Sequence, residues 1–121
     1  MPSISRAEAI SNPDLTGVTI FPMSGPARRG EPQDVLVCVE PGATIPLHTH
    51  EVDARMLVVA GSAEILSDNP SSNGTMVGVG TSIFWEAFGP HGFLAGPKGL
   101  TFLSHNGGIV DENGNWDIAF A

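Results

Sequence analysis

Several features typical of secreted, membrane or nucleic-acid-binding proteins are scarce in this sequence of 121 residues. It has one cysteine, Cys38, so no disulfide can form within the chain, and its apolar neighbours predict a buried, inert thiol. The longest apolar runs, such as Val35–Val39, are far shorter than the roughly 20 residues needed to cross a bilayer. The polar segment Met1–Leu15 lacks the apolar stretch of a secretory signal. We therefore expect a cytoplasmic protein.

Charge is scarce too, and it is mostly of one sign. Charged residues make up 15% of the chain, and 13 acidic against 5 basic residues give a net charge of -8. Such a chain repels phosphate backbones and anionic lipids, so we expect neither nucleic acid nor membrane as a partner. The remaining composition, with 41% hydrophobic residues, 15 glycines and 10 prolines, indicates a compact, turn-rich fold. The length suits one domain spanning residues 1–121.

Short β-rich segments separated by turn residues predict an all-β sandwich or barrel. The one helical candidate is Ser5–Ile10, a brief turn stopped by Asn12 and Pro13. Two central runs, Val35–Val39 and Met56–Ala60, are apolar on both faces, so each face must pack against other apolar groups. One face suits the barrel interior and the other a second sheet or a partner subunit, and we expect a homodimer. The expected strands are Val18–Met23, Asp34–Glu40, Ile45–His50, Arg55–Ala60, Ala63–Leu66, Thr75–Val79, Ser82–Trp85, Gly92–Ala95 and Leu100–Ser104.

Three histidines carry the main functional signal. His48 and His50 are two residues apart, so in a strand both imidazoles project from the same face. His91 follows a turn at the start of another strand, and distant strands become neighbours when a sheet closes on itself. We predict that these three side chains hold one divalent metal ion, for which imidazole ligands favour Zn, Cu, Fe or Ni over Mg or Ca. His105, in a later loop, is expected at the surface or beside the ligands.

Two motifs resemble those of the cupin superfamily. Gly42-x5-His48-x-His50-x3-Ala54-x6-Gly61 is similar to the first cupin motif, Gly-x5-His-x-His-x3-Glu-x6-Gly. Gly80-x5-Glu86-x-Phe88-x2-His91-x3-Ala95 is similar to the second, Gly-x5-Pro-x-Gly-x2-His-x3-Asn. The resemblance, carried by residues 42–61 and 80–95, implies a small single-domain cupin with a double-stranded β-helix, a jelly-roll-like barrel.

The departures from these motifs bear on the chemistry. Ala54 stands where cupins usually place a glutamate ligand, so the site would consist of three histidines without a carboxylate. Such sites resemble those of the β-diketone and hydroxyacetophenone dioxygenases, and the tail Asp111–Asn115 resembles the closing hairpin of that group. This likeness implies a non-haem dioxygenase that binds Fe(II) and cleaves a small diketone or hydroxyketone with O2. Zn, Mn, Ni and Cu remain open as alternatives.

Several other residues are assigned two alternatives. Met56 and Phe93 share strand parity with Ala54 and His91, so the resemblance implies that they line the substrate pocket, unless both are ordinary core. Glu86 would either hydrogen-bond a histidine N–H or pair with Arg55 next to the ligands, or lie solvated in its loop. The two tryptophans, Trp85 and Trp116, would stack on a ligand or, as we favour, simply pack.

The sequence leaves the type of function open. Beside the dioxygenase, a lyase or isomerase could use Mn or Zn as a Lewis acid. A different class of function is a non-catalytic cupin that senses or binds a metal or small ligand.

Overall fold

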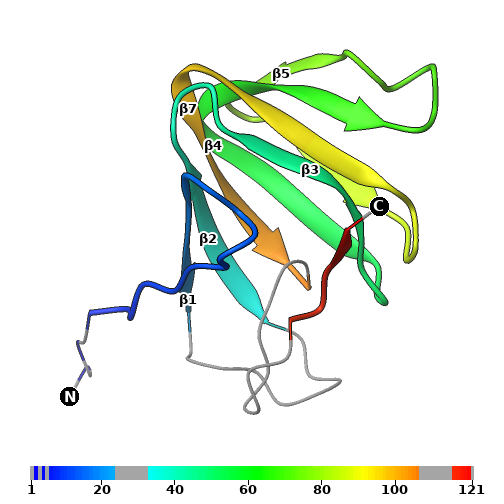
Figure 1. The fold of residues 1–121 in the computed structure, drawn as a ribbon. Helices are drawn as coiled ribbons and strands as arrows, with labels where there is room; N and C mark the ends of the chain where they lie inside the picture. The colour runs from blue at the N-terminus through cyan, green and yellow to red at the C-terminus, as the bar shows by residue number, and fades with distance from the viewer. Residues whose placement is uncertain (1, 3, 5, 24–32, 107–115, 121) are drawn as a thin grey trace.

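The computed structural model describes residues 2, 4, 6–23, 33–106 and 116–120. In that part of the chain all regular structure is β-strand (Figure 1). The predicted helix is therefore wrong over 6–10, which is irregular up to an isolated β-bridge at Ile10, and the predicted tail hairpin Asp111–Asn115 lies outside the described residues. The strands are β1 (Val18–Pro22), β2 (Asp34–Val39), β3 (Thr44–Thr49), β4 (Ala54–Ser67), β5 (Met76–Gly78), β6 (Ser82–Trp85), β7 (His91–His105) and β8 (Ala119–Phe120).

No helix within the described ranges is both long and apolar enough to span a lipid bilayer.

Strand β7 organises the sheet. The sheet order is β1-β2-β7-β3-β8, and β4 pairs with β5, β6 and β7, all antiparallel. The first half of β7 lies between β3 and the end of β4, and its second half lies between β2 and the start of β4. Because one long strand serves two sets of neighbours, the sheet curls around its own inner face (Figure 1).

In each of the two long strands, β4 and β7, the alternation of inward-facing residues is interrupted once, and the two interruptions lie next to each other in the sheet. In β4 the buried residues are Ala54, Met56 and Val58, then Ala63 and Ile65. In β7 they are His91, Phe93 and Ala95, then Leu100, Phe102 and Ser104. The pairing shifts register between Val58 and Ala60 and between Gly61 and Ala63. These bulges bend the strands while keeping apolar side chains on the inner face. Each strand was predicted as two pieces because the alternation breaks at the bulge.

The inner face holds the core. Its central members are Val35 and Val37 of β2 together with Val58, Leu100 and Phe102. The β2 strand alternates buried and half-buried residues, so Cys38 is half-buried on the outer side instead of fully buried as predicted.

The outer face carries a row of apolar side chains, which we call the outer row. It crosses four neighbouring strands through the register pairs Phe21↔Leu36, Leu36↔Leu103 and Leu57↔Leu103. Leu103 and Leu57 are 39% and 40% exposed. The runs predicted to be apolar on both faces therefore do present apolar groups outward.

Candidate metal centre

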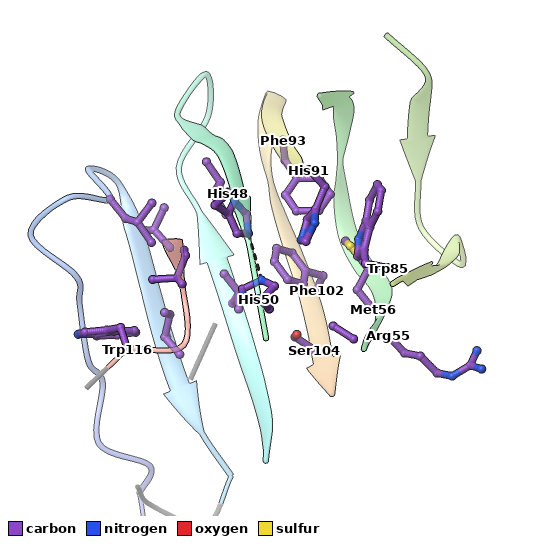
Figure 2. Close-up of a pocket in the computed structure, with 17 residues that line it drawn as sticks. His48, His50, Arg55, Met56, Trp85, His91, Phe93, Phe102, Ser104 and Trp116 are labelled. Carbon is purple, nitrogen blue, oxygen red and sulfur yellow. Dashed lines mark hydrogen bonds between the residues drawn. The ribbon is translucent and has the colours of Figure 1, made fainter. Parts of the chain in front are cut away.

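The fold brings the three predicted histidines together inside the curled sheet. His48 of β3 is the direct register partner of His91 at the start of β7, and His50 follows β3 on the same face. All three side chains are buried, with no more than 6% exposed. One nitrogen from each lies within 4.8 Å of the others, and Figure 2 shows the rings converging from the two strands. The cluster forms because antiparallel pairing of β3 with β7 places His48 next to His91, although the two residues are far apart in the sequence.

The backbone fixes how each ring is presented. The Nδ1 atoms of His48, His50 and His91 lie 2.7, 2.5 and 2.9 Å from the carbonyl oxygens of Pro46, Asp117 and Gly89. A carbonyl oxygen only accepts, so each Nδ1 carries the proton and donates it. In a neutral ring the Nε2 atom then keeps its lone pair. Metal-binding histidines are held by this kind of second hydrogen bond.

Burial keeps two of the rings uncharged. Burial, and after it the neighbouring His91 imidazole, lower the pKa of His48 from 6.5 to about 3 against the opposing effect of the Pro46 carbonyl. Burial likewise lowers the pKa of His91 to about 4. A protonated imidazole cannot bind a metal, so these low pKa values keep the lone pairs available at neutral pH.

The donor set fits a divalent metal ion. The Nε2 atoms of His48 and His50 are 3.1 Å apart. Two imidazole nitrogens that each lie about 2.1 Å from one ion come within roughly 3 Å of each other when the ligands are adjacent. Three imidazole nitrogens in one buried cluster, each ring oriented through its other nitrogen, match the chemistry of a first-row transition metal or zinc.

A cavity of about 50 Å³ opens beside the histidines. Its wall is mostly apolar, and no carboxylate lies among the described residues that line it. Met56 and Phe93 both line this cavity and both belong to the core cluster, and their role in a substrate pocket stays a prediction. Ala54, at the position of the usual cupin glutamate, lines it as well and is 4% exposed.

Trp85 makes a contact that the sequence did not reveal. Its indole ring stacks on the His91 imidazole, with centroids 4.4 Å apart and planes 6° from parallel (Figure 2). Packing had been favoured for this tryptophan, and the partner it packs against is one of the three clustered histidines. Trp116 lines another part of the cavity wall.

Other predicted residues lie away from the cluster. The Glu86 side chain is exposed and forms neither of its predicted pairings among the described residues, since the three histidine Nδ1 atoms donate to backbone carbonyls. The Arg55 guanidinium lies 4.8 Å from the centre of the Phe84 ring, and its side chain points away from the cavity (Figure 2). His105 is exposed, as expected, and its Nδ1 lies 2.5 Å from an Asp34 carboxylate oxygen.

Comparison with solved structures identifies the fold. RemF, a polyketide cyclase from Streptomyces resistomycificus, matches with a TM-score of 0.69 and 26% identity over 87% of this chain and 78% of that one. An RmlC-like cupin from Shewanella frigidimarina matches at 0.67 and 19%, over 83% and 82%. An acetylacetone dioxygenase from Acinetobacter johnsonii matches at 0.66 and 15%, over 96% and 80%.

Other comparisons give no match: neither a protein-family profile nor a curated protein sequence matches this chain.

Fold and site together define the class of protein. The chain has the cupin fold, a double-stranded β-helix, with a cluster of three histidines that could hold a metal ion. Several proteins of similar structure are enzymes. More particularly, it is a cupin fold in which the usual glutamate position is occupied by Ala54.

Proposed function

We propose that this protein is a metal-dependent enzyme acting on a small enolisable dicarbonyl compound, and that with Fe(II) it is a dioxygenase. The observation that carries the proposal is a cluster of three buried imidazoles, without a carboxylate, at the wall of an apolar cavity. His48, His50 and His91 would hold the metal. A divalent ion would supply Lewis acidity there, and a redox-active one such as Fe(II) would add reactivity toward O2.

Charge balance favours an anionic substrate. Three neutral imidazoles leave a divalent ion its full positive charge, and nothing in the described cavity wall offsets it. In a poorly hydrated cavity an unbalanced charge is costly, so an anion is drawn to it. The enolate of a 1,3-dicarbonyl brings one negative charge shared between two oxygens, which suits a metal with open positions.

The chain's own residues restrict size and water. Met56, Phe93 and Phe102 present only apolar surface to the cavity, and its small volume fits a compact substrate. An apolar wall excludes water from the reacting atoms and strengthens the electrostatic attraction between ligand and metal. The three backbone carbonyls that hold the Nδ1 protons keep the rings in place while ligands exchange.

The names of two similar proteins support this substrate class. Acetylacetone is a 1,3-diketone, and polyketides carry carbonyl groups on alternate carbon atoms. Two proteins with different named activities thus point to the same functional group. The likeness to the dioxygenase alone is a likeness of fold.

A second candidate is Lewis-acid catalysis without oxygen, as in a cyclase, lyase or isomerase. It is favoured by the match to RemF, whose 26% identity exceeds that of the dioxygenase. The same cavity could serve either reaction, because both begin with an enolate. A third possibility, a metal or ligand sensor without catalytic activity, shares the site and would show binding only.

The test measures which metal the protein binds and whether O2 is consumed with the substrate. Protein purified without added metal is assayed for bound metals, then reloaded anaerobically with Fe(II), Zn(II), Mn(II), Ni(II) or Cu(II). Acetylacetone and a hydroxyketone are added while O2 is monitored. We expect O2 uptake with the Fe(II) form in proportion to substrate consumed. Substrate conversion without O2 uptake would support the Lewis-acid candidate, and binding without conversion in any metal form would contradict an enzyme.

A further inference from the structure

Trp85 and Ala54 are neighbours on two adjacent strands at the edge of the cavity. They are direct register partners of β6 and β4, so both side chains project from the same face. Both line the cavity. Ala54 is also the position where the first cupin motif has a glutamate, so in this chain a methyl group lies opposite the indole.

The indole N–H of Trp85 has no acceptor in the part of the chain that the structure describes. Its Nε1 atom is buried from solvent and has no hydrogen-bond partner among the described residues. Buried donors in native proteins are nearly always paired, and an unpaired one calls for an explanation. A carboxylate at position 54 would be a natural acceptor, and Ala54 provides none.

The same indole lies next to a proposed metal ligand. Its ring is stacked at 4.4 Å on His91, and the indole lines the cavity that the three histidines also line. Among the described residues that line the cavity, only Ser104 has a side-chain oxygen atom. Since no described residue accepts the Nε1–H proton, a bound ligand or a water molecule can serve as its acceptor.

We propose that Trp85 is a specificity-determining residue whose Nε1–H donates a hydrogen bond to an oxygen of an anionic ligand that occupies the place of the missing glutamate. The ligand oxygen balances the charge of the metal and accepts the indole proton at the same time. This rests on the proposed function insofar as the physiological ligand is an enolate. It adds that the site selects anionic oxygen ligands over other metal ligands.

The first experiment compares ligand binding in the Co(II)-loaded protein by its visible absorption spectrum. Wild type and Trp85→Phe are titrated with acetylacetone, acetate and imidazole, the last having no oxygen. Phe keeps an aromatic ring against His91 but removes the donor. We expect both oxygen ligands to bind about 10-fold more weakly to Trp85→Phe, with Co(II) and imidazole affinities unchanged, which also shows that the variant is folded.

A second pair of variants fills the space opposite Trp85. Ala54→Glu should bind Co(II) more tightly and lose both oxygen ligands, because its own carboxylate takes their place. Ala54→Leu is the matched control, since it occupies similar space without an acceptor and should not tighten Co(II) binding. If Ala54→Glu bound acetate as well as the wild type does, the proposed placement would be wrong.

An NMR measurement observes the donor itself. In Zn(II)-loaded, 15N-labelled protein, with Trp116→Phe used to assign the indole signals, acetate should move the Trp85 N–H resonance downfield. If acetate binds and moves it but acetylacetone does not bind, the proposed substrate class fails and the role of Trp85 stands. If neither anion moves the resonance, or if Trp85→Phe binds both as tightly as wild type, the inference is overturned.

Discussion

The Nε2 atoms of His48 and His50 face each other at 3.1 Å, while the Nδ1 atoms of both rings donate to backbone carbonyls. In neutral rings this places two lone pairs against each other in a buried site. Such an arrangement is repulsive unless a proton or a cation lies between them. A divalent metal relieves the repulsion and gains two ligands at once.

The first prediction concerns metal content. His48→Ala should lose the bound metal, because two remaining imidazoles cannot hold a divalent ion in this cavity as tightly as three. The control is His105→Ala, which removes an exposed histidine paired with Asp34 and should retain one metal per chain. Elemental analysis by mass spectrometry decides the question. Equal metal content in the two variants would contradict the site.

The second prediction concerns the stability of the metal-free protein toward acid. The pKa values of His48 and His91 are lowered in the folded state to about 3 and about 4. Between pH 6.5 and 4 the unfolded chain therefore binds more protons than the folded one. The stability that neutral rings contribute is fully present above pH 6.5 and is lost as pH falls, by up to about 1.4 kcal/mol per pH unit for each ring.

Urea unfolding of metal-free protein between pH 7.5 and pH 4.5 measures this slope. His48→Asn removes one of the two titrating rings and should reduce the slope by up to half. Saturating metal should hold stability constant to lower pH, since bound metal competes with protons. Stability independent of pH across this range would contradict the lowered pKa values.

The third prediction concerns the bend of β4 against β7. Gly61 has φ +73, and a Cβ built on it would lie 2.0 Å from the Gly99 carbonyl oxygen. Gly61→Ala should therefore destabilise the protein by about 2 kcal/mol or more, from strain and backbone displacement together. Gly78→Ala is the control, because its Cβ would meet nothing within 4 Å. Thermal unfolding of both variants is the measurement, and similar melting temperatures would show that this close approach is unimportant.

Sequence spacing predicted the histidine cluster but not what surrounds it. The His48-x-His50 spacing fixes a shared face in any strand, and the second motif places His91 at the start of another strand. The carbonyls of Pro46, Gly89 and Asp117 that orient the rings are backbone atoms, so no residue type marks them. Glu86 was one candidate for that role, beside the alternative of a solvated loop carboxylate, because side-chain carboxylates are the histidine partners that a sequence can display.

Trp85 shows a different limit of sequence reasoning. Its stacking on His91 depends on β6 lying beside the start of β4, with Trp85 directly opposite Ala54. That pairing follows from the curl of the whole sheet and not from local spacing. The strands themselves were predicted closely where a short segment forms one regular strand, as in β2 and β6, and were split in β4 and β7, where the β4–β7 pairing shifts register.

The outer row is the face on which we place the interface of the homodimer expected from the sequence. Leu36, Leu57 and Leu103 are joined by register pairs across β2, β4 and β7, and the flanking Phe84 is 45% exposed. Exposed apolar side chains that gather on one face of a protein can mark an interaction site. A sheet face packed against its own copy by a two-fold axis buries the same residues on both subunits.

We therefore propose that the protein is a dimer in solution and that Leu103→Asp converts it to a monomer. Leu103 points outward between the buried Phe102 and Ser104, so the substitution should leave the cavity and the metal content unchanged while placing a charge at the centre of the interface. Val79→Asp, at an exposed apolar side chain outside the row, is the matched control and should remain dimeric. Sedimentation equilibrium over a range of micromolar concentrations measures both. A monomeric wild type, or a Leu103→Asp variant that still dimerises, would contradict an interface on this face.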